Sequence, residues 1–431
     1  MSTQLMICLV IFALTLISFM VGKFTMATTA LFSMILLTLT GCIDAPTALS
    51  CISNSNTVIM ATMFVVSAGF SRTQMVTKLS GLVGRVSKGS FTKVLAGYVI
   101  IIALLTQFIQ SSMACFSIVF PLACAMCDDL GYSRSKMMFP IGIVSISTVS
   151  ILPIGNAAVM YLTNNGYLQS YGYTTYQFKM LDPTIARLPS MIFIILFAVF
   201  IAPKFAPDKP IVDLSEVDGV FKRPEKKLSS LQEVLSYISF FGIIVMLLTQ
   251  PLHKIPSWEL TTIGALIMVA SGVLKPKDAY EAVGLGGMAV LYAGMLAMAS
   301  ALTATGAGTL VGNWLSAAVG GTTNGYLIGL LFFVIPFLMT QLMMNVAVMN
   351  VFIPIAIITC QSLGCNPIGP IMLVTIGSLT AFMTPMATPT VPMMMGLGGY
   401  DQKTMLKMSW LPAILMCVIN VLWVMTVFPA F

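Results

Sequence analysis

Residues 384–390, Thr-Pro-Met-Ala-Thr-Pro-Thr, interrupt an apolar segment near the C-terminus of the chain. Residues 152–156, Leu-Pro-Ile-Gly-Asn, interrupt an earlier apolar segment in the same way. Because proline lacks a backbone N–H and leaves a carbonyl unpaired, each segment is expected to form a helix that breaks in its middle. The leading prolines, Pro153 and Pro385, are separated by slightly more than half of the chain, which indicates that the chain is built from two copies of one unit.

Further glycines and prolines recur at nearly the same spacing as these two prolines. Gly41 corresponds to Gly272, Pro121 corresponds to Pro354, and the Gly-Tyr pair at 166–167 corresponds to the pair at 399–400. A lone proline or glycine often only kinks a membrane helix, but breaks that recur in both halves point to a binding site where the repeats meet. The repeat therefore bears on function as well as on fold.

The composition predicts a membrane protein. Hydrophobic residues make up 58% of the chain and charged residues only 8%, whereas soluble domains contain about 25% charged residues. The first apolar run, 5–21, has no basic leader or small-residue cleavage site, so we expect it to be a retained helix. The nine cysteines lie mostly in or beside apolar runs and lack the partners of a zinc site, which favours packed thiols.

Two apolar runs are too long for a single crossing. Residues 93–127 and 326–360 each contain a polar interruption, and we expect both to form re-entrant hairpins that enter and leave on one face. The remaining runs of roughly 20 apolar residues predict five crossings in each half. Because five is odd, the second repeat must be inverted relative to the first, and the predicted fold is an all-α polytopic membrane protein with two inverted-topology repeats.

The predicted boundaries follow from these runs. The first repeat covers 1–202, with helices at 5–71, an amphipathic segment at 73–88, the hairpin at 93–127 and the broken helix at 137–163. A cytoplasmic linker covers 203–233, where charges are mixed and prolines are frequent. The second repeat covers 234–431, with helices at 234–303, the hairpin at 326–360 and the broken helix at 367–396.

Residues 73–88 place apolar side chains at helical spacing with basic residues between them, which predicts an amphipathic helix lying in the membrane interface. A frayed basic loop is the alternative, because Gly81 and Gly84 weaken a helix.

Basic residues assign the orientation. With the N-terminus outside, all of the 21 Lys and Arg residues except Lys179, Arg187 and Lys254 fall on the cytoplasmic side, as the positive-inside rule requires. Both termini are then outside, the first hairpin lies on the cytoplasmic side and the second on the outer side. We expect a multi-pass protein of a cell membrane, the bacterial inner membrane, whose net charge of +7 reflects topology rather than nucleic-acid binding.

The predicted spans carry no ionisable side chain, since every acidic and basic residue and the single histidine fall in loops or at helix ends. Intramembrane carboxylates or histidines are typical of proton relays, so their absence argues against a proton pump. An anion would have to be held by helix N-termini, backbone N–H groups and hydroxyls, and a cation by carbonyl and side-chain oxygens. Motifs of soluble enzymes are missing, which predicts no catalytic residue and no enzyme activity.

The chain resembles a known family. Residues 384–390, followed by Met-Met-Met-Gly-Leu-Gly-Gly-Tyr at 393–400, are similar to the C-terminal signature of the divalent anion:sodium symporter (DASS) family. Residues 41–48 and the corresponding segment of the second repeat, 272–279, also resemble sequences of that family. The resemblance covers nearly the whole chain. Members of that family carry a Ser-Asn-Thr triplet at each hairpin tip, ten residues before a proline. The matching positions here are Ser111-Ser112-Met113 and Met344-Asn345-Val346, of which Ser111 and Asn345 keep the family residue.

The breaks and the resemblance together imply a set of site residues. The expected substrate contacts are Ser111, Ser112, Gly155, Asn156, Asn345, Thr388, Pro389 and Thr390. The expected sodium ligands are Ser111, Ser112, Met113, Pro153, Ile154, Met344, Asn345, Val346, Pro385 and Ala387. Sodium is the only metal ion expected, as a coupling ion, and no cofactor is expected.

The resemblance also implies an elevator mechanism, with scaffold and transport domains, and a homodimer in the lipid bilayer. The scaffold helices would be those at 5–71 and 234–303, and residues 73–88 would be an arm that links the scaffold to the transport domain. The leading hypothesis is sodium-coupled import of a small, divalent anion such as a dicarboxylate, a related organic acid or sulfate. An anion exchanger of the same family and a sodium/proton antiporter are the alternatives. Uptake that needs sodium favours the first hypothesis, uptake that needs a counter-substrate favours the second, and sodium-driven proton efflux favours the third.

Overall fold

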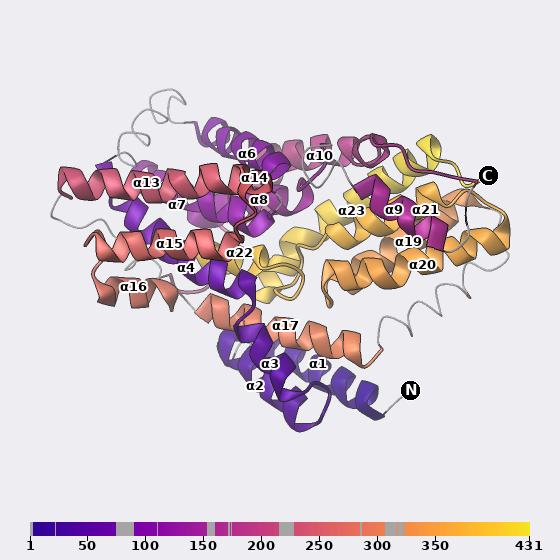
Figure 1. The fold of residues 1–431 in the computed structure, drawn as a ribbon, viewed down its shortest axis with the longest axis horizontal. Coiled ribbons are helices and arrows are strands. Elements are labelled where there is room, and N and C mark those ends of the chain that lie inside the picture. Colours follow the sequence, from indigo (N-terminus) through magenta and orange to yellow (C-terminus); the bar gives the residue numbers. More distant parts are fainter. Residues whose placement is uncertain are drawn as a thin grey trace.

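The computed structural model describes residues 3–21, 23–74, 90–109, 111–152, 160–170, 173, 175–214, 228–284, 287–306, 317, 322 and 324–431. Within these ranges every regular element is a helix (Figure 1). Seven of the described helices are long and apolar enough to cross a membrane, and six shorter apolar helices accompany them. The predicted class, an all-α polytopic membrane protein, is confirmed.

The first half of the chain contains α1 (Thr3–Val21), α2 (Met26–Leu39), α3 (Ala45–Ile52), α4 (Ser55–Ser71), α6 (Phe91–Phe108), α7 (Ser112–Leu130), α8 (Arg134–Ser147), α9 (Met160–Ser170), α10 (Asp182–Phe200) and α11 (Ala202–Phe205). The second half contains α13 (Ser230–Leu248), α14 (Gln250–His253), α15 (Ser257–Ala270), α16 (Pro276–Val283), α17 (Met288–Ala304), α19 (Gly325–Thr340), α20 (Asn345–Leu363), α21 (Ile368–Leu379), α22 (Thr390–Gly398) and α23 (Gln402–Val427).

The two copies share local geometry where the sequence repeats. Gly41 follows α2 and Gly272 follows α15, each with φ of 70°, a conformation that residues with a Cβ rarely adopt. The carbonyl of Gly41 accepts a hydrogen bond from Gln4 Nε2 at 3.4 Å, and that of Gly272 accepts one from Gln232 Nε2 at 3.0 Å. The matching glycines therefore close equivalent turns, while the opposite orientation of the repeats in a membrane stays a prediction.

The helices gather into two groups. One contains α1–α4 with α13, α15, α16 and α17, in which α2 packs on α17 and α4 packs on α15 (Figure 1). A Cβ on Gly294 of α17 would lie 2.6 Å from the carbonyl of Ala30 in α2, so only glycine permits this close approach. The other group contains the two hairpins, the broken helices, α10 and α23, and it meets the first through α4 against α7, α17 against α22 and α1 against α23.

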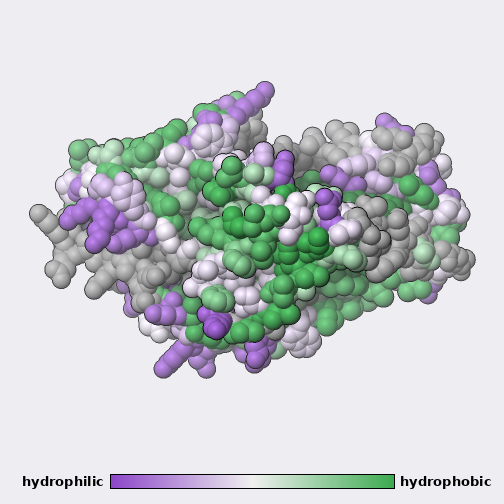
Figure 2. Space-filling model, turned by 90° about the horizontal axis from the view of Figure 1, so that it is seen from below, coloured by the Kyte–Doolittle hydropathy of each residue, from purple (hydrophilic) through white to green (hydrophobic). Residues whose placement is uncertain are grey.

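The surface suits a lipid environment. Figure 2 shows hydrophobic residues spread broadly over the face on which α1–α3 lie, with hydrophilic residues toward the edges. Val10 and Leu14 on α1 and Phe32 on α2 are each more than half exposed. Exposed apolar side chains of this size are costly in water and favourable against lipid tails.

Several boundaries differ from those that the sequence predicted. Helix α10 begins at Asp182 rather than near 186, because Pro183 fits the first turn of a helix. Arg187 consequently lies in the second turn of this helix with 3% of its surface exposed. The expectation that every basic residue lies in a loop or at a helix end is therefore wrong for Arg187. The predicted arm at 73–88 falls outside the described residues from 75 onward.

The described start of the linker is packed rather than free. Helix α11 continues from α10, and the backbone N–H groups of Ile211 and Val212 donate to the carbonyl of Gly399 at 2.8 and 3.1 Å. Gly399, with φ of 67°, ends helix α22. The first residues of the linker thus hold the end of the second broken helix, while 215–227 lie outside the described part of the chain.

Candidate functional site

Both predicted hairpins contain two consecutive helices. Helix α6 ends at Phe108 and α7 begins at Ser112, while α19 ends at Thr340 and residues 341–344 join it to α20. Helices α7 and α20 each have 19 residues, contain one proline, and end on a left-handed glycine, Gly131 or Gly364. Left-handed glycines are common helix ends because they pair the last carbonyls without steric cost. That the hairpins re-enter the same face of a membrane stays a prediction.

The second break is described in full, and the first only in part. Helix α21 ends at Leu379 and α22 begins at Thr390, so residues 380–389 form the second break. Helix α8 ends at Ser147, and the predicted site residues Pro153, Ile154, Gly155 and Asn156 lie outside the described residues.

Each break is held by a glutamine from the hairpin of its own repeat. Gln107 Nε2 donates to the carbonyl of Thr148 at 2.8 Å, and its Oε1 accepts from the N–H groups of Ile151 and Leu152 at 3.2 and 3.1 Å. The side chains of Gln107 and of its counterpart Gln341 are buried, so they provide hydrogen-bond partners for backbone groups that lie outside the helices.

Gln341 makes the equivalent contacts in the second copy. Its Nε2 donates to the carbonyl of Thr380 at 2.9 Å, and its Oε1 accepts from the N–H of Met383 at 3.0 Å. From the sequence, these glutamines were only polar interruptions of apolar runs. The available signal for a shared role was that Gln107 and Gln341 occupy corresponding places in the two repeats.

The first hairpin tip contacts the second break. Ser112 Oγ lies 2.9 Å from Thr390 Oγ1, although the two residues are 278 positions apart. Ser145 Oγ of α8 donates to the carbonyl of Ser112 at 2.6 Å, and Ser111 Oγ caps α7 by accepting from the N–H of Ala114 at 3.2 Å. The structure thus brings Ser112 into contact with Thr390, with Ser111 next to Ser112 in the chain, while their role in binding substrate stays a prediction.

At the second hairpin tip, Thr340 Oγ1 lies 2.6 Å from the carbonyl of Ser378 and 2.9 Å from the side-chain oxygen assigned to Asn345. A hydroxyl has one hydrogen, so Thr340 can donate to only one of these two acceptors at a time. The Asn345 oxygen has two lone pairs and therefore keeps acceptor capacity for a cation.

The remaining predicted residues differ in which atoms they can present to a substrate or to sodium. Thr388 is buried and donates from Oγ1 to the carbonyl of Ala381 at 3.4 Å, while Pro389 is partly buried. Pro385 and Ala387 are buried within the second break, and the Met113 side chain is buried. Met344 and Val346 have exposed side chains. These last five residues can coordinate sodium only through backbone carbonyls.

Helix ends supply fixed partial charges to the same region. Ser112, Asn345 and Thr390 are the first residues of α7, α20 and α22. The N-terminus of a helix carries about half a positive charge and unpaired N–H groups, which suit an anion. Helices α8 and α21 end at the breaks with their carbonyl groups, which suit a cation. The arrangement can therefore bind both kinds of ligand side by side.

Arg187 brings a full positive charge to the first break, which the sequence interpretation had excluded. Its Nη1 donates to the carbonyl of Ser150 at 3.0 Å and its Nη2 to the carbonyl of Ser147 at 3.4 Å. Among the described residues, no carboxylate forms an ion pair with Arg187. A signal was available, because Arg187 is one of only three basic residues that the positive-inside rule left unexplained.

Metal sites of other kinds find no support in the part of the chain that the structure describes. No group of three His, Cys, Asp or Glu side chains there could hold a metal ion. All nine cysteines are free thiols.

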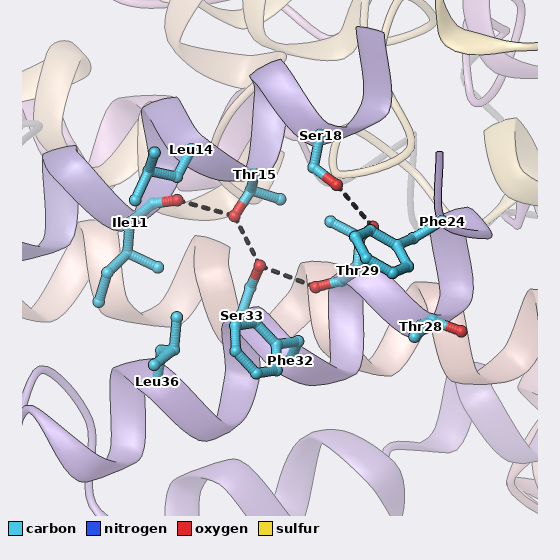
Figure 3. A pocket seen from close by; sticks show the side chains of 10 residues that line it. All are labelled: Ile11, Leu14, Thr15, Ser18, Phe24, Thr28, Thr29, Phe32, Ser33 and Leu36. Carbon is cyan, nitrogen blue, oxygen red and sulfur yellow. Dashed lines mark hydrogen bonds between the residues drawn. The ribbon is translucent and has the colours of Figure 1, made fainter. Parts of the chain in front are cut away.

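A cavity of about 380 Å³ lies apart from these residues, between α1 and α2 (Figure 3). Its hydroxyl groups bond one another, with Thr15 2.6 Å from Ser33 and Ser18 2.9 Å from Thr29. Apolar side chains form the rest of its wall, and none of the predicted site residues lines it.

Comparison with known proteins places the chain among transporters. The family model described as citrate transporter matches residues 10–368 and, in a second match, residues 244–430. An uncharacterised transporter of Synechocystis sp. is 38% identical over 84 residues, which are 20% of this chain and 14% of that protein. An uncharacterised transporter of Haemophilus influenzae is 38% identical over 86 residues, 20% of this chain and 19% of that protein. The Escherichia coli uncharacterised transporter YfbS is 25% identical over 183 residues, 42% of this chain and 30% of that protein. Each match thus spans less than a third of the relative's length.

Proposed function

Since the citrate transporter model matches most of the sequence, the chain belongs to that family, and we propose that it is a secondary transporter of small organic anions. Citrate and related carboxylates are the proposed substrates, and sodium is the proposed coupling ion. The finer resemblance to divalent anion:sodium symporters supports the sodium coupling. The protein acts by transport and not by catalysis.

The observation that carries the proposal is the contact between Ser112 and Thr390. It joins the hairpin tip of one repeat to the broken helix of the other, so that two helix N-termini converge on one point. A carboxylate can bind where these N-termini meet, because N–H groups, hydroxyls and helix dipoles all favour negative charge. A binding site where two repeats meet is typical of secondary transporters.

The cation site of the proposal lies at the second hairpin tip and the second break. The Asn345 oxygen and the carbonyls of Pro385 and Ala387 are neutral oxygen donors, which hard cations prefer over nitrogen or sulfur. A cation bound beside the anion would partly neutralise it, which supports coupled movement of the two.

An elevator movement and a homodimer are proposed from the resemblance. The two helix groups touch through α4 with α7, α17 with α22 and α1 with α23, and these contacts would slide if the hairpin group moves against the scaffold. The predicted orientation, with both termini outside a bacterial inner membrane, is part of the same proposal.

Uptake into proteoliposomes tests the function. Labelled citrate should accumulate under an inward sodium gradient, and succinate, malate and sulfate serve as competitors. Thr390→Val removes the hydroxyl that meets Ser112 and should reduce uptake, whereas Thr390→Ser keeps the hydroxyl and should retain it. Accumulation that requires internal citrate but not sodium would instead identify an exchanger. Sodium-driven proton efflux without citrate uptake would identify an antiporter.

A further inference from the structure

We propose that Thr184 and Gln402 are positioning residues for the two breaks, each completing a clamp that holds both polar backbone atoms of one residue. The clamped residues are Ile151 and Met383, which lie two positions before the prolines of the breaks. The inference rests on the proposed function where it assigns the sodium dependence of transport to the second clamp. Its other measurement, hydrogen exchange, does not depend on transport.

The second clamp holds Met383 from two helices. The N–H of Met383 donates to Gln341 Oε1 at 3.0 Å, and its carbonyl accepts from Gln402 Nε2 at 3.0 Å. Gln341 directly follows α19 of the hairpin, whereas Gln402 is the first residue of α23. The second break is therefore fixed both to the hairpin before it and to the helix that follows it.

The first clamp has the same plan with a different donor. The N–H of Ile151 donates to Gln107 Oε1 at 3.2 Å, and its carbonyl accepts from Thr184 Oγ1 of α10 at 2.7 Å. Ile151 and Met383 are separated by the same number of residues as the two break prolines, so they are equivalent residues of the repeats. Thr184 and Gln402 are not at equivalent positions, although both lie in the first turn of the helix that follows the broken helix. The two copies thus make the same contact with unrelated side chains.

The Gln402 side chain gives an independent observation. It is 2% exposed, and its Oε1 is buried without a hydrogen-bond partner among the described residues. Turning the amide over would place this oxygen against the Met383 carbonyl, and two acceptors cannot share a hydrogen bond, so the donor faces Met383. A buried acceptor without a partner destabilises the fold and offsets the gain from the donor. We therefore assign to Gln402 the direction of the break rather than the stability of the fold.

Met383 directly precedes the proposed cation ligands. The carbonyls of Pro385 and Ala387 lie within the next four residues of the chain, and the N–H of Ala387 donates back to the carbonyl of Thr384 at 3.1 Å. A rotation of the Met383 peptide would therefore be passed on through this tight turn to both ligand carbonyls. Since ligands that are already held in the bound geometry bind more tightly, the second clamp should set the affinity for sodium.

Hydrogen exchange of the purified protein, followed by mass spectrometry, tests both clamps without transport. Gln402→Met keeps the length of the side chain but removes the donor, and it should speed exchange about fivefold in peptides that span 380–389, as expected for one lost hydrogen bond. Exchange in peptides that span 148–152 should stay unchanged. Thr184→Val should give the reverse pattern, and Thr184→Ser, which keeps the hydroxyl, should match wild type. Each clamp variant is thus the control for the other.

Citrate uptake at graded sodium concentrations tests the positioning role of Gln402. Gln402→Met should raise the sodium concentration for half-maximal uptake about fivefold. The maximal rate at saturating sodium and the thermal unfolding temperature should stay close to wild type. The matched control is Lys403→Gln, because Lys403 is the next residue of α23 and its side chain is exposed. This control should keep the wild-type sodium curve.

Three results would overturn the inference. Wild-type exchange at 380–389 in Gln402→Met would show that Gln402 does not hold the break. A lower unfolding temperature and maximal rate with an unchanged sodium curve would show that Gln402 serves only the stability of the fold, and so would failure of the variant to fold. Wild-type exchange at 148–152 in Thr184→Val would remove the first clamp. If wild-type uptake ignores sodium, the proposed coupling fails, and the exchange patterns still decide whether the clamps exist.

Discussion

Replacing Gln341 with leucine removes the side chain that holds the second break against the hairpin tip. The Gln341 side chain is 5% exposed, donates to the carbonyl of Thr380 at 2.9 Å and accepts from the N–H of Met383 at 3.0 Å. Leucine has a similar volume but no polar atom, so the change removes these two contacts without opening a large cavity.

The cost follows from the number of backbone groups that lose this partner. Each buried N–H or carbonyl left without a hydrogen bond costs roughly 1–3 kcal/mol, so the two groups together cost about 2–6 kcal/mol, offset in part by the added apolar burial of leucine. This is a sizeable fraction of the roughly 5–15 kcal/mol that stabilises a typical fold. Since about 1.4 kcal/mol is tenfold in an equilibrium, the break should leave its native geometry at least about tenfold more often.

We expect Gln341→Leu to lower the thermal unfolding temperature of the purified protein and to reduce citrate uptake by at least about tenfold. Gln341→Glu keeps an acceptor for the Met383 N–H and should be less severe. The matched control is Gln4→Leu, because Gln4 is exposed and makes one long contact, 3.4 Å, to the Gly41 carbonyl. Unfolding temperature and uptake of Gln341→Leu equal to those of Gln4→Leu would refute the reasoning.

Three further predictions concern single positions. Asn345→Ala should reduce uptake at limiting citrate by about one to two decades, the loss expected for one buried polar contact of about 1–3 kcal/mol. The variant should still elute as a folded protein in size-exclusion chromatography. Uptake within about twofold of wild type would reject a role of Asn345 in the site. Gly377→Ala should destabilise the protein, because its Cβ would lie 2.6 Å from a carbonyl of α19, whereas Gly97→Ala in α6 meets nothing within 4 Å and should be neutral or stabilising by up to about 1 kcal/mol in thermal unfolding. Single cysteines at Lys93 and Asp129, which are both exposed, should react with an impermeant reagent from the same side of the membrane, and labelling from opposite sides would show that the first hairpin crosses it.

Much of the fold could be predicted because its signals are local. Apolar runs of sufficient length can satisfy their backbone in lipid only as helices, and the class follows from composition. The polar interruptions near Gln107 and Gln341 fall where the structure turns between paired helices. The prolines at 153 and 385 and the glycines at 41 and 272 predicted the repeat, because a change of backbone direction requires special residues.

The site could be predicted only as a set of positions. Nothing along the chain indicates that Ser112 lies 2.9 Å from Thr390, because hydrophobic periodicity reports which residues are apolar and not which helices pack together. The same limit explains why the partners of Gln107 and Gln341 went unseen.

Composition and local residue type were enough to predict the membrane class and the places where helices break, since both depend on the solvation of the backbone next to the residue concerned. The pairing of charges and polar groups could be seen only in the folded chain. Arg187 illustrates the difference: in the sequence it is a basic residue near a helix start, but packing of α10 against the end of α8 buries it on two carbonyls. A charge is tolerated at such a depth only when distant segments supply its partners, and those segments meet only in the folded chain.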